Sequence, residues 1–198
     1  MKTIVFDMGG VLLPLEVQRC MDSFRRILGP QFDRLGLGSD GEGESVMAEY
    51  EGGRIGTDEF VGRILSWCLP GTTAEDVKRA WTDMLTAVPA ERIEFIKKLR
   101  AEGYRVFLLS NTNELHWNNV IHTTPEFPDC FEHTFLSHLE KLSKPDPKFF
   151  RRITEYMGVR PSDIIFVDDL AANRAGAEEC GWSTCESVES LAAILKRQ

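Results

Sequence analysis

The chain opens on an uninterrupted apolar run, Ile4-Val5-Phe6, which ends at Asp7. A short run of this kind is typical of a strand that is buried on both faces. Similar segments, rich in apolar and β-branched residues, recur in the second half of the chain. The strands predicted in this way cover residues 3–6, 104–109, 134–136, 164–167 and 182–185.

Apolar residues at helical spacing occupy the stretches between these strands. Repeated strand–helix units of this length indicate a parallel sheet with right-handed crossovers. We therefore predict an α/β fold, in which a doubly wound parallel sheet is covered by helices. The helices predicted for this part cover residues 90–102, 114–121, 147–157 and 171–180, and a last helix ends the chain.

Residues 16–88 show helical periodicity but no convincing strand. This pattern predicts an all-helical insert, a cap domain at 16–88, within a core domain made of 1–15 and 89–198. A glycine-rich stretch at 36–43 divides the insert. Its helices are predicted from Val17 to Gly29-Pro30, around 45–50, after Thr57 as N-cap, and from Thr73, also an N-cap, to Leu85.

Charge narrows the classes of partner. The 198 residues carry 31 acidic side chains and 23 lysine or arginine side chains, a net charge of −8, with the two signs interspersed. Binding to nucleic acid or to an anionic membrane needs a basic surface. Neither partner is therefore expected, and an anionic substrate would need a local source of positive charge. The sequence does not indicate an oligomeric state.

Cysteine usage and the N-terminus predict a cytoplasmic location. The five cysteines are an odd number without Cys-x-x-Cys spacing, which is typical of reduced thiols. Asp7 interrupts the first apolar stretch after three residues, so no secretory signal is expected. No run approaches transmembrane length. The cysteines are Cys20, Cys68, Cys130, Cys180 and Cys185.

Two of the predicted strands end on carboxylates: Asp7 follows the first, and Asp168-Asp169 follow the strand at 164–167. Active sites of open α/β sheets lie at these strand ends. A single Asp there is often only a turn residue, but two such strand ends favour a site. Three carboxylates brought together would repel one another unless a cation held them. Hard oxygen ligands of this kind suit Mg²⁺.

Lys144, in a Lys-Pro-Asp-Pro segment, would add a second cation. Ser110 and Asn111 end the strand at 104–109 with a hydroxyl and an amide that could hydrogen-bond an anion. Each residue also has an ordinary interpretation. Lys144 could be a solvated lysine, and Ser110 or Asn111 could be a turn residue or an N-cap. Taken singly, these residues leave both interpretations open.

The order and spacing of these residues resemble the haloacid dehalogenase superfamily, most of whose members are Mg²⁺-dependent phosphatases. Its four motifs match Asp7, Ser110, Lys144 and Asp168-Asp169. The resemblance implies a Rossmann-like core, and the insert is similar to the superfamily's small helical cap. The segments at 7–10, 110–116 and 144–147 resemble a bacterial branch that includes a sugar-1-phosphate phosphatase.

The resemblance also implies which residues bind metal. Asp7 would be the nucleophile that forms an aspartyl-phosphate, which water then hydrolyses. Mg²⁺ would bind Asp7, the backbone carbonyl of Gly9 and Asp169, with Asp168 close by or acting through water. Asn173 stands where many relatives carry another acid, which puts a metal role there in doubt.

The same resemblance implies which residues bind the substrate. Ser110, the amide of Asn111 and Lys144 would hold the transferring phosphoryl oxygens. This division suits phosphoryl transfer, which is catalysed chiefly by positioning and charge stabilisation. It also supplies the local positive charge that an acidic protein needs.

Gly9 departs from the superfamily's pattern, in which a second Asp two residues after the nucleophile is general acid and base. General acid and base catalysis typically increases the reaction rate by about 10²–10⁴-fold. Three answers are open: a leaving group that needs little protonation, such as an anomeric sugar phosphate; a feeble enzyme; or a substitute acid. Candidates for that acid are Glu51, His116 and His122, although a structural role is favoured for His116. Residues 51–60 resemble the family's cap loop that faces the active site.

The leading hypothesis is a Mg²⁺-dependent phosphatase acting on a small phosphorylated metabolite, in particular a sugar phosphate. A second is a 2-haloacid dehalogenase, although those relatives use no metal and lack the acidic pair found here at 168–169. A third is a catalytically weak regulatory domain. Retention of Asp7, Lys144 and Asp169 together speaks against it, because an idle cluster of carboxylates only destabilises a fold.

Overall fold

Five parallel strands form one sheet in the computed structural model, which describes residues 2–36 and 42–197. The strand order is β3-β2-β1-β4-β5, so β1 lies at the centre. Phe6 of β1 pairs with Leu108 of β2 on one side and with Val167 of β4 on the other. The predicted parallel sheet is confirmed. The strands are β1 Thr3–Phe6, β2 Arg105–Ser110, β3 Thr134–Leu136, β4 Ile164–Val167 and β5 Ser183–Cys185.

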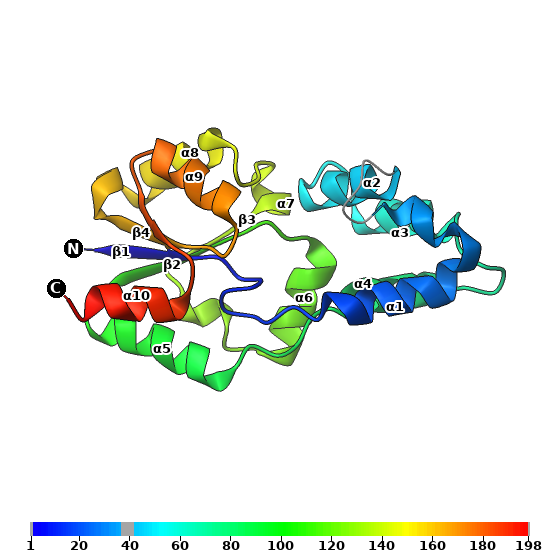
Figure 1. Ribbon diagram of the computed structural model, residues 1–198, viewed down its shortest axis with the longest axis horizontal. Coiled ribbons are helices and arrows are strands. Elements are labelled where there is room, and N and C mark those ends of the chain that lie inside the picture. The colour runs from blue at the N-terminus through cyan, green and yellow to red at the C-terminus, as the bar shows by residue number, and fades with distance from the viewer. Residues whose placement is uncertain (1, 37–41, 198) are drawn as a thin grey trace.

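Helices cover both faces of this sheet (Figure 1). Successive strand residues point to opposite faces. Ile4 and Phe6 therefore join the apolar cluster that contains residues of α5 and α10, whereas Val5 joins the cluster of α8 and α9. The helices of this part are α5 Ala90–Ala101, α6 Glu114–Thr123, α8 Pro147–Met157, α9 Ala171–Glu179 and α10 Val188–Leu195.

The described helices between β1 and α5 lie beyond the C-terminal ends of the strands (Figure 1). They bury an apolar cluster of their own, in which Phe60 stacks on Tyr50 with ring centroids 4.4 Å apart. Thr73 and Asp76 form a reciprocal capping box at the start of α4, as expected for a Thr N-cap. The division into a core and a cap domain stays a prediction. The elements are α1 Val17–Leu28, the 3₁₀ helix η1 Gly29–Leu35, α2 Glu42–Glu51, α3 Thr57–Leu65 and α4 Ala74–Thr82.

Several predicted boundaries were wrong by one or more residues. Thr57 is the first residue of α3 rather than its N-cap, because its hydroxyl bonds the Tyr50 hydroxyl at 2.8 Å and Gly56 takes the cap position. β2 extends to Ser110 because the pairing with β3 continues to that residue. Of the glycine-rich stretch, residues 37–41 lie outside the described part. Short helices were not predicted: α7 Ser137–Glu140, η2 Pro128–Cys130 and η3 Pro161–Asp163.

The five cysteines are free thiols, in agreement with the prediction from their number and spacing. Cys20 is fully buried, and burial raises the pKa of its thiol to about 12. Such a thiol is inert at neutral pH, because the thiolate is the reactive form. Among the residues that the structure describes, no helix is long and apolar enough to cross a membrane.

Candidate active site

The carboxylates of Asp7, Asp168 and Asp169 come together at the C-terminal edge of the sheet. β1 and β4 are paired neighbours, so the residues that follow Phe6 and Val167 emerge side by side. The Asp7 N–H donates to the Val167 carbonyl at 2.8 Å. One ligand oxygen of each of the three acids lies within 4.8 Å of the others. The structure thus assembles the acidic cluster that the sequence predicts.

Lys144 lies within this cluster. Its Nζ is 2.8 Å from Asp7 Oδ1 and 2.6 Å from Asp168 Oδ2, and its side chain is 1% exposed. The side chain of Asn111 holds the Lys144 backbone from both sides: its Nδ2 donates to the Lys144 carbonyl and its Oδ1 accepts the Lys144 N–H, each at 2.8 Å. The interpretation of Lys144 as a solvated lysine is therefore wrong. Asn111 has a positioning role that the sequence analysis missed.

Asp168 is fully buried, and its carboxylate accepts hydrogen bonds from three residues. Lys144 contacts one carboxylate oxygen, and Asn173 Nδ2 lies 3.1 Å from both oxygens. The Leu170 N–H donates to Oδ1 at 2.9 Å. Asn173 thus binds the acid of the cluster instead of adding another acid. With its oxygens occupied, Asp168 is suited to orient Lys144.

Asp169 differs from its neighbour because it is exposed. Within the described part of the chain, its carboxylate has no hydrogen-bond or ion-pair partner. Gly10, at φ +79°, allows the close approach: a Cβ there would collide with the Asp169 carboxylate. The backbone is held by Arg174, whose Nη1 donates to the carbonyls of Asp168 and Asp169 at 2.8 Å.

These donors fit a divalent cation. The three carboxylates (−3) and the Lys144 ammonium (+1) sum to −2 in formal charge. The unpartnered carboxylate of Asp169 is a hard oxygen donor, which Mg²⁺ prefers. Burial, together with the negative charge of Asp168, raises the pKa of the Asp7 carboxyl to about 6 against the opposing charge of Lys144. A cation at the cluster would lower this pKa and keep Asp7 ionised.

Ser110 and Asn111 lie at the same edge, on the other side of β1. Phe6 pairs with Leu108, so Ser110 is one residue beyond the strand position that faces Asp7. Ser110 is 1% exposed, and its hydroxyl makes only a long contact of 3.5 Å to the Asn111 carbonyl. The structure therefore brings the residues of all four predicted motifs to one edge. Their roles in binding and catalysis stay predictions.

The two histidine candidates for the missing acid lie elsewhere. His116 is buried, stacks on Trp81 at 4.8 Å and lies 3.0 Å from the Trp81 carbonyl through Nε2. Burial lowers its pKa to about 4, so it is neutral and structural, as favoured from the sequence. His122 is exposed and lines a groove with Glu75 and Lys78 of the helical segment. Neither histidine belongs to the carboxylate cluster.

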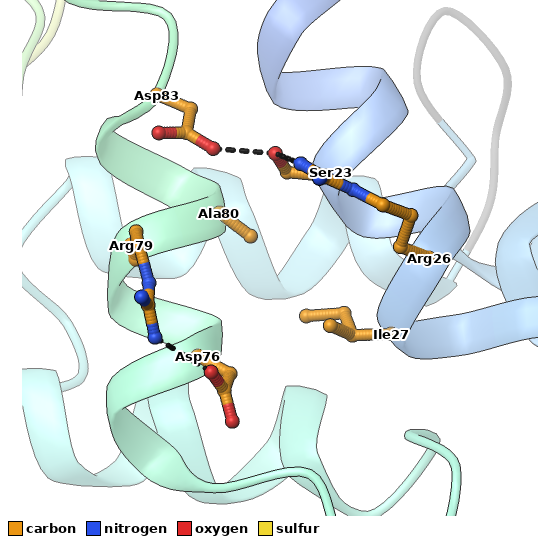
Figure 2. A pocket seen from close by; sticks show the side chains of 7 residues that line it. All are labelled: Ser23, Arg26, Ile27, Asp76, Arg79, Ala80 and Asp83. Atoms are coloured by element: carbon orange, nitrogen blue, oxygen red, sulfur yellow. Dashed lines mark hydrogen bonds and ion pairs between the residues drawn. The ribbon is translucent and has the colours of Figure 1, made fainter.

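A pocket of about 300 Å³ between α1 and α4 is distinct from this site (Figure 2). Figure 2 shows Arg79 directed at Asp76, and Asp83 facing Ser23 across the two helices. Most charged side chains that line the pocket hydrogen-bond to another lining residue. None of the residues that line it belongs to the four motifs.

Two phosphatases are similar to this chain over most of its length. D-ribitol-5-phosphate phosphatase of Bacteroides thetaiotaomicron is 30% identical over an alignment 193 residues long, which covers 92% of this chain and 90% of that protein. Sesquiterpene phosphatase astK of Aspergillus oryzae is 26% identical and covers 98% of this chain and 94% of its own length. Both comparisons span the helical segment as well as the sheet.

Solved structures show the same architecture. A haloacid dehalogenase family enzyme from Bacteroides thetaiotaomicron, in complex with magnesium and inorganic phosphate, matches with a TM-score of 0.83 at 33% identity, over 94% of this chain and 93% of that one. A predicted HAD-like hydrolase from Porphyromonas gingivalis matches with a TM-score of 0.87 at 27% identity, over 100% and 99% of the two chains. The model of the haloacid dehalogenase-like hydrolase family matches residues 1–181. The resemblance predicted from the motifs is thus confirmed, and the chain belongs to the haloacid dehalogenase-like hydrolases.

Proposed function

We propose that the protein is a Mg²⁺-dependent phosphomonoester hydrolase that acts on a small phosphorylated metabolite through an aspartyl-phosphate. One observation carries this proposal: Asp7, Asp168 and Asp169 come together at the end of the sheet, where Lys144 pairs with Asp7 and Asp168, and the four groups carry a net charge of −2. A phosphatase needs a nucleophile, a cation for the phosphoryl oxygens and a metal site at one place. The magnesium and phosphate complex of the Bacteroides enzyme supports this assignment.

Each residue has a defined task in this proposal. The Asp7 carboxylate attacks phosphorus, the ester oxygen leaves, and water then hydrolyses the aspartyl-phosphate to release phosphate and restore Asp7. Lys144 and Ser110, with the amide of Asn111, bind phosphoryl oxygens. Asp7, the carbonyl of Gly9 and Asp169 would hold Mg²⁺. The bound metal would neutralise charge on the transferring phosphoryl group.

A sugar or polyol phosphate is the substrate class that we propose. The first-named relative is a phosphatase of D-ribitol 5-phosphate, an ester of a primary alcohol. This comparison broadens the expectation from anomeric sugar phosphates to ordinary alkyl phosphates. An alkoxide leaving group needs a proton, so for such a substrate another group must replace the acid that is missing at Gly9.

Turnover of p-nitrophenyl phosphate with Mg²⁺, with EDTA and with the Asp7→Asn variant tests the mechanism. We expect the loss of Asp7 to reduce turnover by about 10³-fold or more, because no nucleophile remains. Asp22→Asn, an exposed change on α1, is the control and should leave turnover unchanged. Activity that ignores EDTA or survives Asp7→Asn would contradict the proposal. Hexose 1-phosphates, hexose 6-phosphates and ribitol 5-phosphate then identify the preferred ester.

A further inference from the structure

Gly9 has no side chain that could donate a proton, and a Cβ there would require the exposed Leu15 side chain to shift slightly. A Cβ on Gly9 would lie 3.0 Å from Leu15 Cδ1, so the Leu15 side chain occupies the space beside the nucleophile's loop. Asp168 cannot supply the proton either, because Lys144 and Asn173 hold its oxygens. A proton donor for an alkoxide leaving group must therefore come from outside the floor formed by the strand ends.

Glu51, the last residue of α2, is held over this edge of the sheet. Its carbonyl accepts a hydrogen bond from Ser137 Oγ at 2.6 Å, and the same hydroxyl accepts the Thr112 N–H at 2.9 Å. Ser137 directly follows Leu136, the β3 residue that pairs with Ser110. One side chain thus joins Glu51 to the loop that follows β2. In Figure 1, α7 lies beside α2 at this place.

The segments on either side of Glu51 are also attached to the core. The Tyr50 hydroxyl accepts the Leu115 N–H at 3.1 Å, and Lys141 Nζ donates to the Gly53 carbonyl. Gly53 has φ +62°, and a Cβ there would collide with the His138 carbonyl, so the loop is packed tightly against α7. These contacts define the position of the Glu51 backbone relative to the four motifs.

The Glu51 carboxyl has no partner in the part of the chain that the structure describes. The residue is only partly exposed, and burial raises the pKa of its carboxyl to about 7. Such a group is partly protonated at neutral pH, so it can both donate and accept a proton. Burial is the one cause of this shift, to which no charged neighbour among the described residues contributes. The charged groups on the elements next to α2 have partners of their own or lie in the same loop: His138 at the Thr112 carbonyl, Lys141 at Gly53, Arg63 with Glu49 and Glu59, Glu114 with Thr57, Arg34 over the Trp67 ring, and Arg54 beside Gly52.

We propose that Glu51 is the general acid and base that replaces the side chain missing at Gly9; this inference rests on the proposed phosphatase function. As the Asp7 oxygen bonds to phosphorus and the ester P–O bond breaks, the Glu51 proton passes to the leaving oxygen, which departs as an alcohol. Glu51 then takes a proton from the water that attacks the aspartyl-phosphate. The bond between Asp7 and phosphorus breaks, and phosphate, the Asp7 carboxylate and protonated Glu51 result.

Leaving-group dependence tests this role. We compare wild-type protein, Glu51→Gln and the matched control Glu49→Gln on two esters, glycerol phosphate and 2,4-dinitrophenyl phosphate. The first ester needs a proton on its leaving oxygen and the second does not. We expect Glu51→Gln to lower kcat/KM for glycerol phosphate by about 10²–10³-fold, and that for dinitrophenyl phosphate by less than about threefold. Glu49, on the same helix and paired with Arg63 at 3.1 Å, should tolerate the change on both esters.

The second step gives an independent readout. If Glu51 also activates the water, Glu51→Gln should release a burst of dinitrophenol equal to the enzyme concentration before slow turnover. Equal losses of kcat/KM on the two esters, accompanied by a lower Tm, would show a structural role and overturn the inference. So would unchanged kcat/KM for glycerol phosphate. Failure of the phosphatase proposal itself looks different, because wild-type protein would then hydrolyse neither ester, or Asp7→Asn would remain active.

Discussion

Asp168, at the end of β4, and Glu51, at the end of α2, are both acids with little exposure to solvent. Of the two carboxyl groups, only that of Asp168 has hydrogen-bond partners among the described residues. Lys144, Asn173 and the Leu170 N–H hold the two oxygens of Asp168. The carboxyl of Glu51 has none within the described residues, and burial raises its pKa to about 7. Burial without hydrogen-bond donors favours the protonated form of a carboxyl group.

The comparison separates two parts of the candidate site. The floor, made by the strand ends, has its charges arranged before any substrate binds, which suits binding of a phosphoryl group common to all substrates. The loop at the end of α2 has ionisable groups without partners in place, which suits contact with the variable part of a substrate. We therefore expect changes in the floor to affect every ester alike, and changes at Glu51 to depend on the leaving group.

Removing Lys144 should break the floor most severely. Lys144 Nζ lies 2.8 Å from Asp7 Oδ1 and 2.6 Å from Asp168 Oδ2. In Lys144→Met, these two carboxylates would face each other without the cation between them. Loss of one partner of a buried ion pair is worth about 3–5 kcal/mol of stability, and loss of one stabilising donor about 10²–10³-fold in kcat. Urea unfolding at pH 7 with EDTA, and turnover of both esters, measure these effects.

An exposed lysine is the matched control for that change. Lys78→Met removes a cation that lies 3.7 Å from Glu75 on the surface of α4, where an ion pair is worth about 0–1 kcal/mol. We expect little change in stability or turnover. Equal stability of Lys144→Met and wild-type protein would show that the floor does not depend on this ion pair.

Gly10→Ala should disturb the open side of the floor. The backbone there has φ +79°, and the added Cβ would collide with the Asp169 carboxylate. We expect a loss of about 1–3 kcal/mol in stability and weaker Mg²⁺ binding, measured by urea unfolding and by Mg²⁺ titration calorimetry. Gly62→Ala is the control, because its Cβ would meet open space within α3 and should slightly stabilise that helix. Unchanged Mg²⁺ affinity in Gly10→Ala would exclude Asp169 as a ligand.

Of the three changes, Glu51→Gln should have the smallest effect on stability, and one that depends on pH. The pKa of Glu51 rises from 4.5 in the unfolded chain to about 7 in the fold, so the folded state retains a proton that the unfolded state releases. The stability that this proton contributes is present below pH 4.5 and is lost as pH rises through about 7. Since Gln cannot ionise, the variant should gain on the order of 1–2 kcal/mol relative to wild-type protein between pH 5 and pH 8.

Urea unfolding at the two pH values checks this expectation. Glu49→Gln serves again as control, because its ion pair with Arg63 is partly exposed and should contribute less than about 1 kcal/mol. A difference between Glu51→Gln and wild-type protein that does not change with pH would mean that Glu51 is already ionised in the fold. Glu51 would then have no proton to donate at neutral pH.

Most of the fold could be predicted because its signals are local. Ile4-Val5-Phe6 and the run at 164–167 are apolar throughout, and both became central strands. Errors arose where a contact between distant segments decided the local structure. Thr57 looks like an N-cap in sequence, but the Tyr50 hydroxyl engages its side chain and Gly56 takes the cap position. The short helix α7 has too few residues to show a periodicity.

The candidate site divides in the same way. The sequence by itself determined that Asp7 and Asp168 follow strands and that Ser110 lies at a strand end, because a strand end is marked by the switch from apolar to polar residues. Lys144 was grouped with them through the resemblance to the superfamily. The sequence did not reveal that the Asn111 side chain hydrogen-bonds the Lys144 backbone, in addition to the predicted binding of a phosphoryl group by the Asn111 amide.

Only the tertiary structure decided which polar groups have partners. The hydrogen bonds of Asp168, the contact of Gly10 with Asp169 and the attachment of Glu51 through Ser137 each join segments far apart in the chain. The sequence offered Glu51, His116 and His122 as possible acids, with a structural role favoured for His116. Burial and hydrogen bonding distinguish them, because the ionisation of a group depends on its surroundings in three dimensions.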